Sequence, residues 1–289
     1  MAATYEDRYW TSSDGLDLHY RNYAAPDGAA AKLPVLCMHG LTRNARDFAA
    51  LADVLAATRR VIVPEMRGRG LSDYAPDSDT YSPVTYVQDV EKLLAEEGIT
   101  RFAVVGTSMG GLMTMLMAAA NPGRMSAVVM NDIGPVIDPA GLSRISGYVG
   151  QGRSYPTWVH AARGLAEAQA AAFPDYDLDQ WLEMAKRTMV VTQNGRISFD
   201  YDMAIAEPFA KPGNAAPANL WTAFDALAGV PMLLVRGGLS DLLSEDTVAQ
   251  MGQRNPVMRT VTVPRVGHAP TLDEAEVRAA ILALLDAAE

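Results

Sequence analysis

The sequence predicts an α/β protein with a mainly parallel, mostly eight-stranded sheet, helices on both faces of the sheet and an inserted helical cap. Short apolar runs of strand length alternate with segments of helical periodicity, which is typical of βαβ units. The alternation stops after Gly134 and resumes near Leu220, and the segment between them has a mostly helical pattern. The length of 289 residues, 49% of them apolar, suits one large domain with such an insertion.

The first elements are expected to be a hairpin and two buried strands. Asp14-Gly15 lies between the runs Arg8–Ser12 and Leu16–Tyr23, and Asp-Gly is a frequent hairpin turn. Pro34–Met38 and Arg60–Pro64 are apolar and short enough for buried strands. The helix between these two strands has its apolar stripe at Phe48, Leu51, Ala52 and Leu55.

The middle of the chain predicts two further strands and two helices. Ser82 followed by Pro83 is a helix start, and Gly98 ends that helix. The apolar runs Arg101–Thr107 and Met125–Asn131 are the fifth and sixth predicted strands. Between them, the segment Gly110–Asn121 is apolar on nearly all sides, as a buried helix is.

The cap is predicted at 135–219, inserted after the sixth strand, and the core domain at 1–134 and 220–289. Trp158–Ala171 and Leu178–Met189 are the clearest helices of the cap. The remaining core elements are expected as strands at Pro231–Val235 and Thr260–Val263, a helix near Thr247–Gln253, and a last helix capped by Thr271 and Glu274.

Charge and cysteine usage exclude several classes of function. The formal net charge is −10 and no basic cluster occurs, so neither nucleic acid nor an anionic membrane is expected as a partner. The single cysteine, Cys37, excludes an intrachain disulfide and a cysteine-rich metal site. The N-terminus has no secretory pattern and no apolar run has membrane-spanning length, so we expect a cytoplasmic protein.

A G-x-S-x-G pentapeptide, Gly106-Thr107-Ser108-Met109-Gly110, joins the fifth strand to the buried helix. Such a sharp turn holds its serine on a strained backbone at a helix N-terminus, where negative charge is favoured. The pentapeptide alone also fits an ordinary turn, but this strand–turn–helix context predicts that Ser108 is a nucleophile.

A serine nucleophile needs a base, and the chain has four histidines: His19, His39, His160 and His268. His268 lies in the loop after the last strand, downstream of the serine, and is the predicted base. The acid that orients it should follow a strand. Asp241, after Leu233–Val235 and the turn Arg236–Ser240, is the preferred acid, and Asp132, after Met125–Asn131, is its competitor.

These pieces resemble the α/β-hydrolase superfamily, with the chain order Ser…Asp…His. The resemblance covers nearly the whole chain outside the cap. The matching segments are His39-Gly40, Arg67–Asp73, Gly106–Gly111, Gly237–Asp241 and Gly267-His268. It implies an oxyanion hole made of the backbone N–H groups of Leu41 and Met109, and a structural role for His39 and for the Arg67–Asp73 loop.

The expected function is hydrolysis of small soluble carboxylic esters by Ser108, His268 and Asp241 through an acyl-enzyme, with no metal and no organic cofactor. Lactone opening and cleavage of a C–C bond in a vinylogous diketone use the same groups and stay open as alternatives. A ligand-binding receptor on a hydrolase scaffold is a third hypothesis. The presence of all three expected catalytic residues, Ser108, His268 and Asp241, argues against it. A small-molecule ester is the expected partner.

Overall fold

The computed structural model describes residues 4–26, 32–210 and 219–288. The stretch 211–218, which belongs to the predicted cap, lies outside the described residues.

An eight-stranded sheet forms the core, with the strand order β1-β2-β4-β3-β5-β6-β10-β11. Its strands are β1 (Glu6–Thr11), β2 (Asp17–Tyr23), β3 (Val35–Met38), β4 (Val61–Pro64), β5 (Phe102–Thr107), β6 (Met125–Asn131), β10 (Met232–Gly237) and β11 (Met258–Val263). The hairpin β1–β2 and the pair β2–β4 are antiparallel, and all other neighbours are parallel. The predicted fold class is confirmed.

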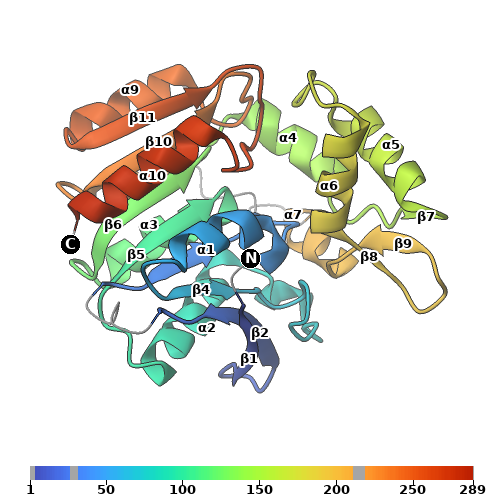
Figure 1. Ribbon diagram of the computed structural model, residues 1–289, viewed down its shortest axis with the longest axis horizontal. Helices are drawn as coiled ribbons and strands as arrows, with labels where there is room; N and C mark the ends of the chain where they lie inside the picture. Colours follow the sequence, from blue (N-terminus) through green and yellow to red (C-terminus); the bar gives the residue numbers. More distant parts are fainter. Residues whose placement is uncertain (1–3, 27–31, 211–218, 289) are drawn as a thin grey trace.

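Helices cover both faces of this sheet (Figure 1). The larger core cluster packs under α2 (Pro83–Glu96), α3 (Met109–Ala120), α8 (Trp221–Asp225) and α9 (Glu245–Arg254). The other cluster packs under α1 (Ala49–Leu55), which follows the short 3₁₀ helix η1 (Ala45–Phe48), and under α10 (Ala275–Ala287). A further 3₁₀ turn, η2 (Ser78–Thr80), precedes α2.

Central strands are buried along their whole length because both faces are covered. Along β5, Val104 belongs to the cluster on one face, whereas Ala103 and Val105 belong to the cluster on the other. Along β10, Leu234 alternates with Leu233 and Val235 in the same way. This period of two explains why continuous apolar runs mark these strands.

Between β6 and α8 the chain leaves the sheet and builds a body with its own small core (Figure 1). Its helical elements are α4 (Pro139–Tyr148), α5 (Trp158–Gln169), α6 (Leu178–Thr188), η3 (Met203–Ala206) and α7 (Glu207–Ala210). We refer to the described residues from Pro135 to Asn219 as the cap; the exact domain boundaries at 134 and 220 stay a prediction.

The cap also contains strands, which the sequence analysis did not expect. Strands β7 (Ser154–Tyr155), β8 (Met189–Val191) and β9 (Ile197–Phe199) form an antiparallel sheet in the order β7-β9-β8. They are too short and too exposed to produce an apolar run. The signal that could have revealed them is Asn194-Gly195, a hairpin turn in which Gly195 has a φ of 75°.

Candidate active site

Ser108 lies in a sharp turn between β5 and α3. Its φ of 52° is in the left-handed region, which is unusual for a residue with a side chain. The turn is possible because glycines surround it: a Cβ on Gly110 would be 2.0 Å from Met38 O, and a Cβ on Gly106 would be 2.6 Å from Gly110 C. Strand β5 and helix α3 therefore approach closely enough to present Ser108 at the carboxyl edge of the sheet.

His268 lies directly against this serine. Its Nε2 atom is 2.8 Å from Ser108 Oγ, within hydrogen-bonding distance. The imidazole is nearly buried, with 7% of its side chain exposed. The loop that carries it is held in place by Asn131, whose side-chain amide donates to Pro270 O at 2.8 Å. The structure thus brings together the predicted nucleophile and the predicted base.

The carboxylate that meets His268 belongs to Asp132, and the prediction that Asp241 occupies this position is wrong. Asp132 Oδ2 lies 2.8 Å from His268 Nδ1, and Asp132 is completely buried. Its carboxylate also accepts hydrogen bonds from Gly237 N–H at 2.8 Å and from the Ser240 hydroxyl at 2.7 Å. Buried polar groups need hydrogen-bond partners, and the last residue of β10 and the loop after it supply them.

Asp241 turns away from the histidine, towards the cap. Its two oxygens accept hydrogen bonds from Arg144 of α4 at 2.5 and 2.8 Å. The hydrogen bonds from Arg144 lower the pKa of Asp241, while the same contact raises the pKa of Arg144. In the loop after β10, Ser240 therefore donates a hydrogen bond to Asp132, whereas Asp241 forms an ion pair between the core and the cap.

The two N–H groups expected to form an oxyanion hole flank the serine. Met109 is the first residue of α3, where no helical carbonyl is available to its N–H. Leu41 follows the turn at Gly40, and a Cβ on Gly40 would lie 3.6 Å from Ser108 Cβ, so this turn runs beside the nucleophile. Among the described residues, no backbone carbonyl accepts a hydrogen bond from Leu41 N–H, so this N–H group is available to a ligand.

His39 is part of this turn. Its Nδ1 contacts Gly40 O at 2.7 Å, and its Nε2 accepts a hydrogen bond from Met66 N–H at 3.1 Å. Burial lowers its pKa to about 4, so the ring is neutral near pH 7. Because both ring nitrogens are occupied away from Ser108, His39 braces the turn.

Arg69, in the Arg67–Asp73 loop, holds Leu41 from the other side. It is completely buried, and its Nε donates to Leu41 O at 3.0 Å. Its Nη1 donates to Arg67 O at 2.7 Å and to the Tyr86 hydroxyl at 2.9 Å. The guanidinium also lies over the Tyr86 ring, 4.9 Å from its centroid. The loop therefore supports the turn at His39–Leu41, which we call the oxyanion turn. The sequence alone did not indicate this contact.

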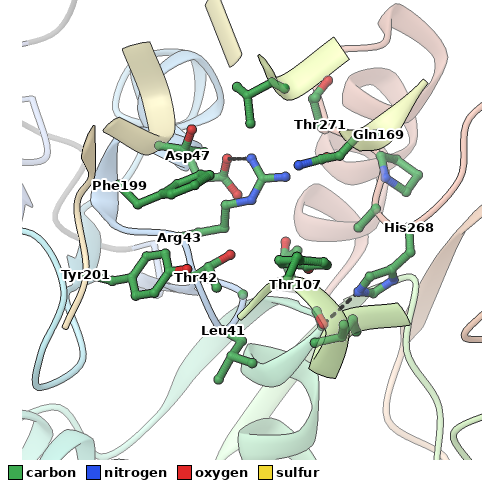
Figure 2. A pocket seen from close by; sticks show the side chains of 18 residues that line it. Leu41, Thr42, Arg43, Asp47, Thr107, Gln169, Phe199, Tyr201, His268 and Thr271 are labelled. Carbon is green, nitrogen blue, oxygen red and sulfur yellow. Dashed lines mark hydrogen bonds and ion pairs between the residues drawn. The ribbon is translucent and has the colours of Figure 1, made fainter. Parts of the chain in front are cut away.

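A cavity of about 60 Å³ lies beside Ser108, between the core and the cap (Figure 2). The core lines it with the serine, the histidine, the oxyanion turn and the polar side chains Thr42, Arg43, Asp47 and Thr271. The cap lines it with Ile145, Tyr148, Leu165, Gln169, Thr188, Phe199 and Tyr201. Both the core and the cap therefore line the space beside Ser108.

Neither a metal site nor a membrane span is found in the parts of the chain that the structure describes. Within 4–26, 32–210 and 219–288, no three His, Cys, Asp or Glu side chains are grouped as metal ligands would be. No helix in these ranges is long and apolar enough to cross a bilayer. The two remaining histidines lie elsewhere: His19 contacts Asp7 and Glu65, and His160 contacts Thr157.

Comparison with known proteins places the chain in a family of known fold. A family model described as the alpha/beta hydrolase fold matches residues 34–275. A 3-hydroxybutyrate-oligomer hydrolase from Cupriavidus necator is 36% identical over 270 residues, which is 90% of this chain and 91% of the relative. A crystal structure of an alpha/beta hydrolase from Novosphingobium aromaticivorans is 59% identical, with a TM-score of 0.94 and 99% of each chain covered. A 2-(acetamidomethylene)succinate hydrolase from Mesorhizobium japonicum is 25% identical over 81% of both chains.

Proposed function

Because the chain belongs to the alpha/beta hydrolase family, we propose that it is a serine hydrolase that cleaves small soluble carboxylic esters through an acyl-enzyme. One observation carries the proposal: Ser108 Oγ and the buried Asp132 carboxylate each lie 2.8 Å from opposite nitrogens of His268. A hydroxyl, a base and an orienting acid in a row are the groups that nucleophilic acyl transfer requires.

In the first half-reaction, His268 Nε2 takes the proton of Ser108 as Oγ attacks the ester carbonyl. The Leu41 and Met109 N–H groups, with the N-terminus of α3, stabilise the negative charge that develops on the carbonyl oxygen. The imidazolium then gives its proton to the leaving alkoxide, and the acyl group remains on Ser108.

In the second half-reaction, His268 removes a proton from water as the water oxygen attacks the acyl carbon. The imidazolium then returns this proton to Ser108 Oγ as the bond to the acyl group breaks, and the carboxylic acid leaves. Throughout, Asp132 accepts from Nδ1–H, which keeps the free electron pair on Nε2 and stabilises the imidazolium. Every proton moved in the cycle therefore passes through His268.

The ester class is supported by the relative from Cupriavidus necator, which is named for oligomers of 3-hydroxybutyrate. Lactones and vinylogous diketones would use the same groups, so the same assay should include one of each. The linear dimer of 3-hydroxybutyrate and 4-nitrophenyl butyrate are the first esters to test.

The test is Ser108→Ala, assayed on both esters beside the wild-type protein. We expect kcat/KM to fall by roughly three to six orders of magnitude, because the residual rate comes from binding and the oxyanion hole alone. An unchanged melting temperature would show that the fold is intact, and a fluorophosphonate should label wild-type Ser108 but not the variant. Ester turnover near the wild-type level in Ser108→Ala would contradict the proposal.

A further inference from the structure

Arg43 places a guanidinium in the same cavity that Ser108 lines. A Cβ built on Gly40 would lie 3.5 Å from Arg43 Cγ and 3.6 Å from Ser108 Cβ, so the stem of the arginine begins next to the serine. The side chain runs into the cavity between Asp47 and Gln169, with His268 on the other side (Figure 2). A positive charge therefore faces the cavity in which an ester would bind at Ser108.

Most of the hydrogen-bonding capacity of Arg43 is unused. Its Nη1 contacts Asp47 Oδ1 at 3.3 Å and Met184 Sδ at 3.0 Å. Its Nε and Nη2 donate to no other group that the structure describes. Arg67 provides the contrast, because it makes four hydrogen bonds of 2.7–2.9 Å with Asp14 and Asp89. An arginine that served only to pair with a carboxylate would be expected to bind it with two parallel N–H groups.

The surroundings of Arg43 add hydrogen-bonding groups. Thr42 and Gln169 also line the cavity, and neither side chain bonds to another group in the described parts of the chain. Gln169 extends from α5 towards Arg43 across the cavity (Figure 2). The half-buried Arg43 is the positive group here, and Asp47 is its weakly held counter-charge, with side chains 17% and 14% exposed. Arg43, Thr42 and Gln169 can thus donate hydrogen bonds to a small anion from more than one side.

We propose that the ester cleaved at Ser108 carries a carboxylate a few atoms from the scissile bond, and that Arg43 binds this carboxylate. This inference rests on the proposed function. The planar guanidinium matches a carboxylate with two N–H groups, and the ligand would replace the single long contact to Asp47. Arg43 is then a specificity-determining residue, and it discriminates against neutral esters of the same size.

The test compares pairs of esters that differ only in charge. One pair is the linear 3-hydroxybutyrate dimer and the same dimer with its carboxyl group converted to a primary amide. The other is 4-nitrophenyl hydrogen glutarate and the corresponding glutaramate, which places the charge on the acyl side. The variants are Arg43→Met and Arg43→Lys, with Arg124→Met as the matched control. Arg124 is a half-buried arginine that pairs with Glu91 and does not line the cavity.

In at least one pair, wild-type protein should prefer the acid over the amide by roughly 10- to 100-fold in kcat/KM, the value of a charged hydrogen bond. Arg43→Met should remove this preference, mainly through KM, because the carboxylate is held equally in the ground and transition states. Arg43→Lys should keep part of the preference for the acid, and Arg124→Met should keep all of this preference. Retained turnover of the amides would show that Arg43→Met is folded.

An active wild-type protein that does not discriminate within either pair would overturn the inference and leave the esterase proposal standing. A preference that survives in Arg43→Met would overturn it as well. Calorimetric titration of Ser108→Ala protein needs no turnover: it should bind 3-hydroxybutyrate more tightly than 3-hydroxybutyramide. Equal binding of the two would count against the role of Arg43, even if no ester proved to be a substrate.

Discussion

Asp132 Oδ2 lies 2.8 Å from His268 Nδ1, although 136 residues separate the two in the sequence. The contact forms at the carboxyl edge of the sheet, where β6 ends at Asn131 and the chain turns at Asp132 with a φ of 54°. It determines which of two strand-terminal acids can orient the base.

We therefore expect Asp132→Asn to reduce kcat for ester hydrolysis about 10⁴-fold, because an amide at this position favours the wrong tautomer of His268. Asp241→Asn should leave kcat within a few-fold of wild type, because Asp241 contacts Arg144. Single-turnover assays of both variants on 4-nitrophenyl butyrate measure the difference. Thermal melts serve as the control for folding, and a larger loss in Asp241→Asn would return the acid to that residue.

Because cap residues roof the cavity beside Ser108, we expect the protein to prefer short acyl chains. Each methylene contributes about 0.8 kcal/mol while it can be buried, and a longer chain then clashes with the cap. Across 4-nitrophenyl esters of increasing length, we expect kcat/KM to peak at a short chain, with no activation by substrate micelles. A maximum at long chains would show that the cap is a mobile lipase lid.

Within that series, Ile145→Ala should move the maximum to a longer acyl chain, because Ile145 is a buried residue of α4 that lines the cavity. Val159→Ala is the matched control, since Val159 is 38% exposed on α5 and does not line the cavity. The same shift in both variants would point to a general loosening of the cap.

The glycines that shape the serine turn should be sensitive to a single methyl group. Gly110→Ala would place a Cβ 2.0 Å from Met38 O, and we expect the free energy of unfolding to fall by about 3 kcal/mol or more. Gly147→Ala is the control, because Gly147 is exposed on helix α4 with open space around it, and alanine there should be neutral or stabilising. Urea unfolding measures both variants; equal stability of the two would refute the packing argument.

The sequence by itself determined the alternation of strands and helices, the turn that carries Ser108, and the loop that carries His268. These features depend on local patterns: the short apolar run that contains Val104 and Val105, the capping of α2 by Ser82, and the glycines around Ser108. Each constrains the backbone within a few residues, so each can be recognised without knowledge of the fold.

Only the tertiary structure showed which carboxylate contacts His268 and which polar groups line the cavity. Asp132 and Asp241 both follow strands, and the choice between them depends on how the loop after β10 folds. Gly237 N–H at the end of β10 and the Ser240 hydroxyl in that loop donate hydrogen bonds to Asp132. Asp241 instead pairs with Arg144 of the cap. Likewise, only the structure shows that Arg43 lines the same cavity as Gln169, a cap residue far away in the sequence. Contacts between distant segments depend on loop conformations that no local periodicity encodes.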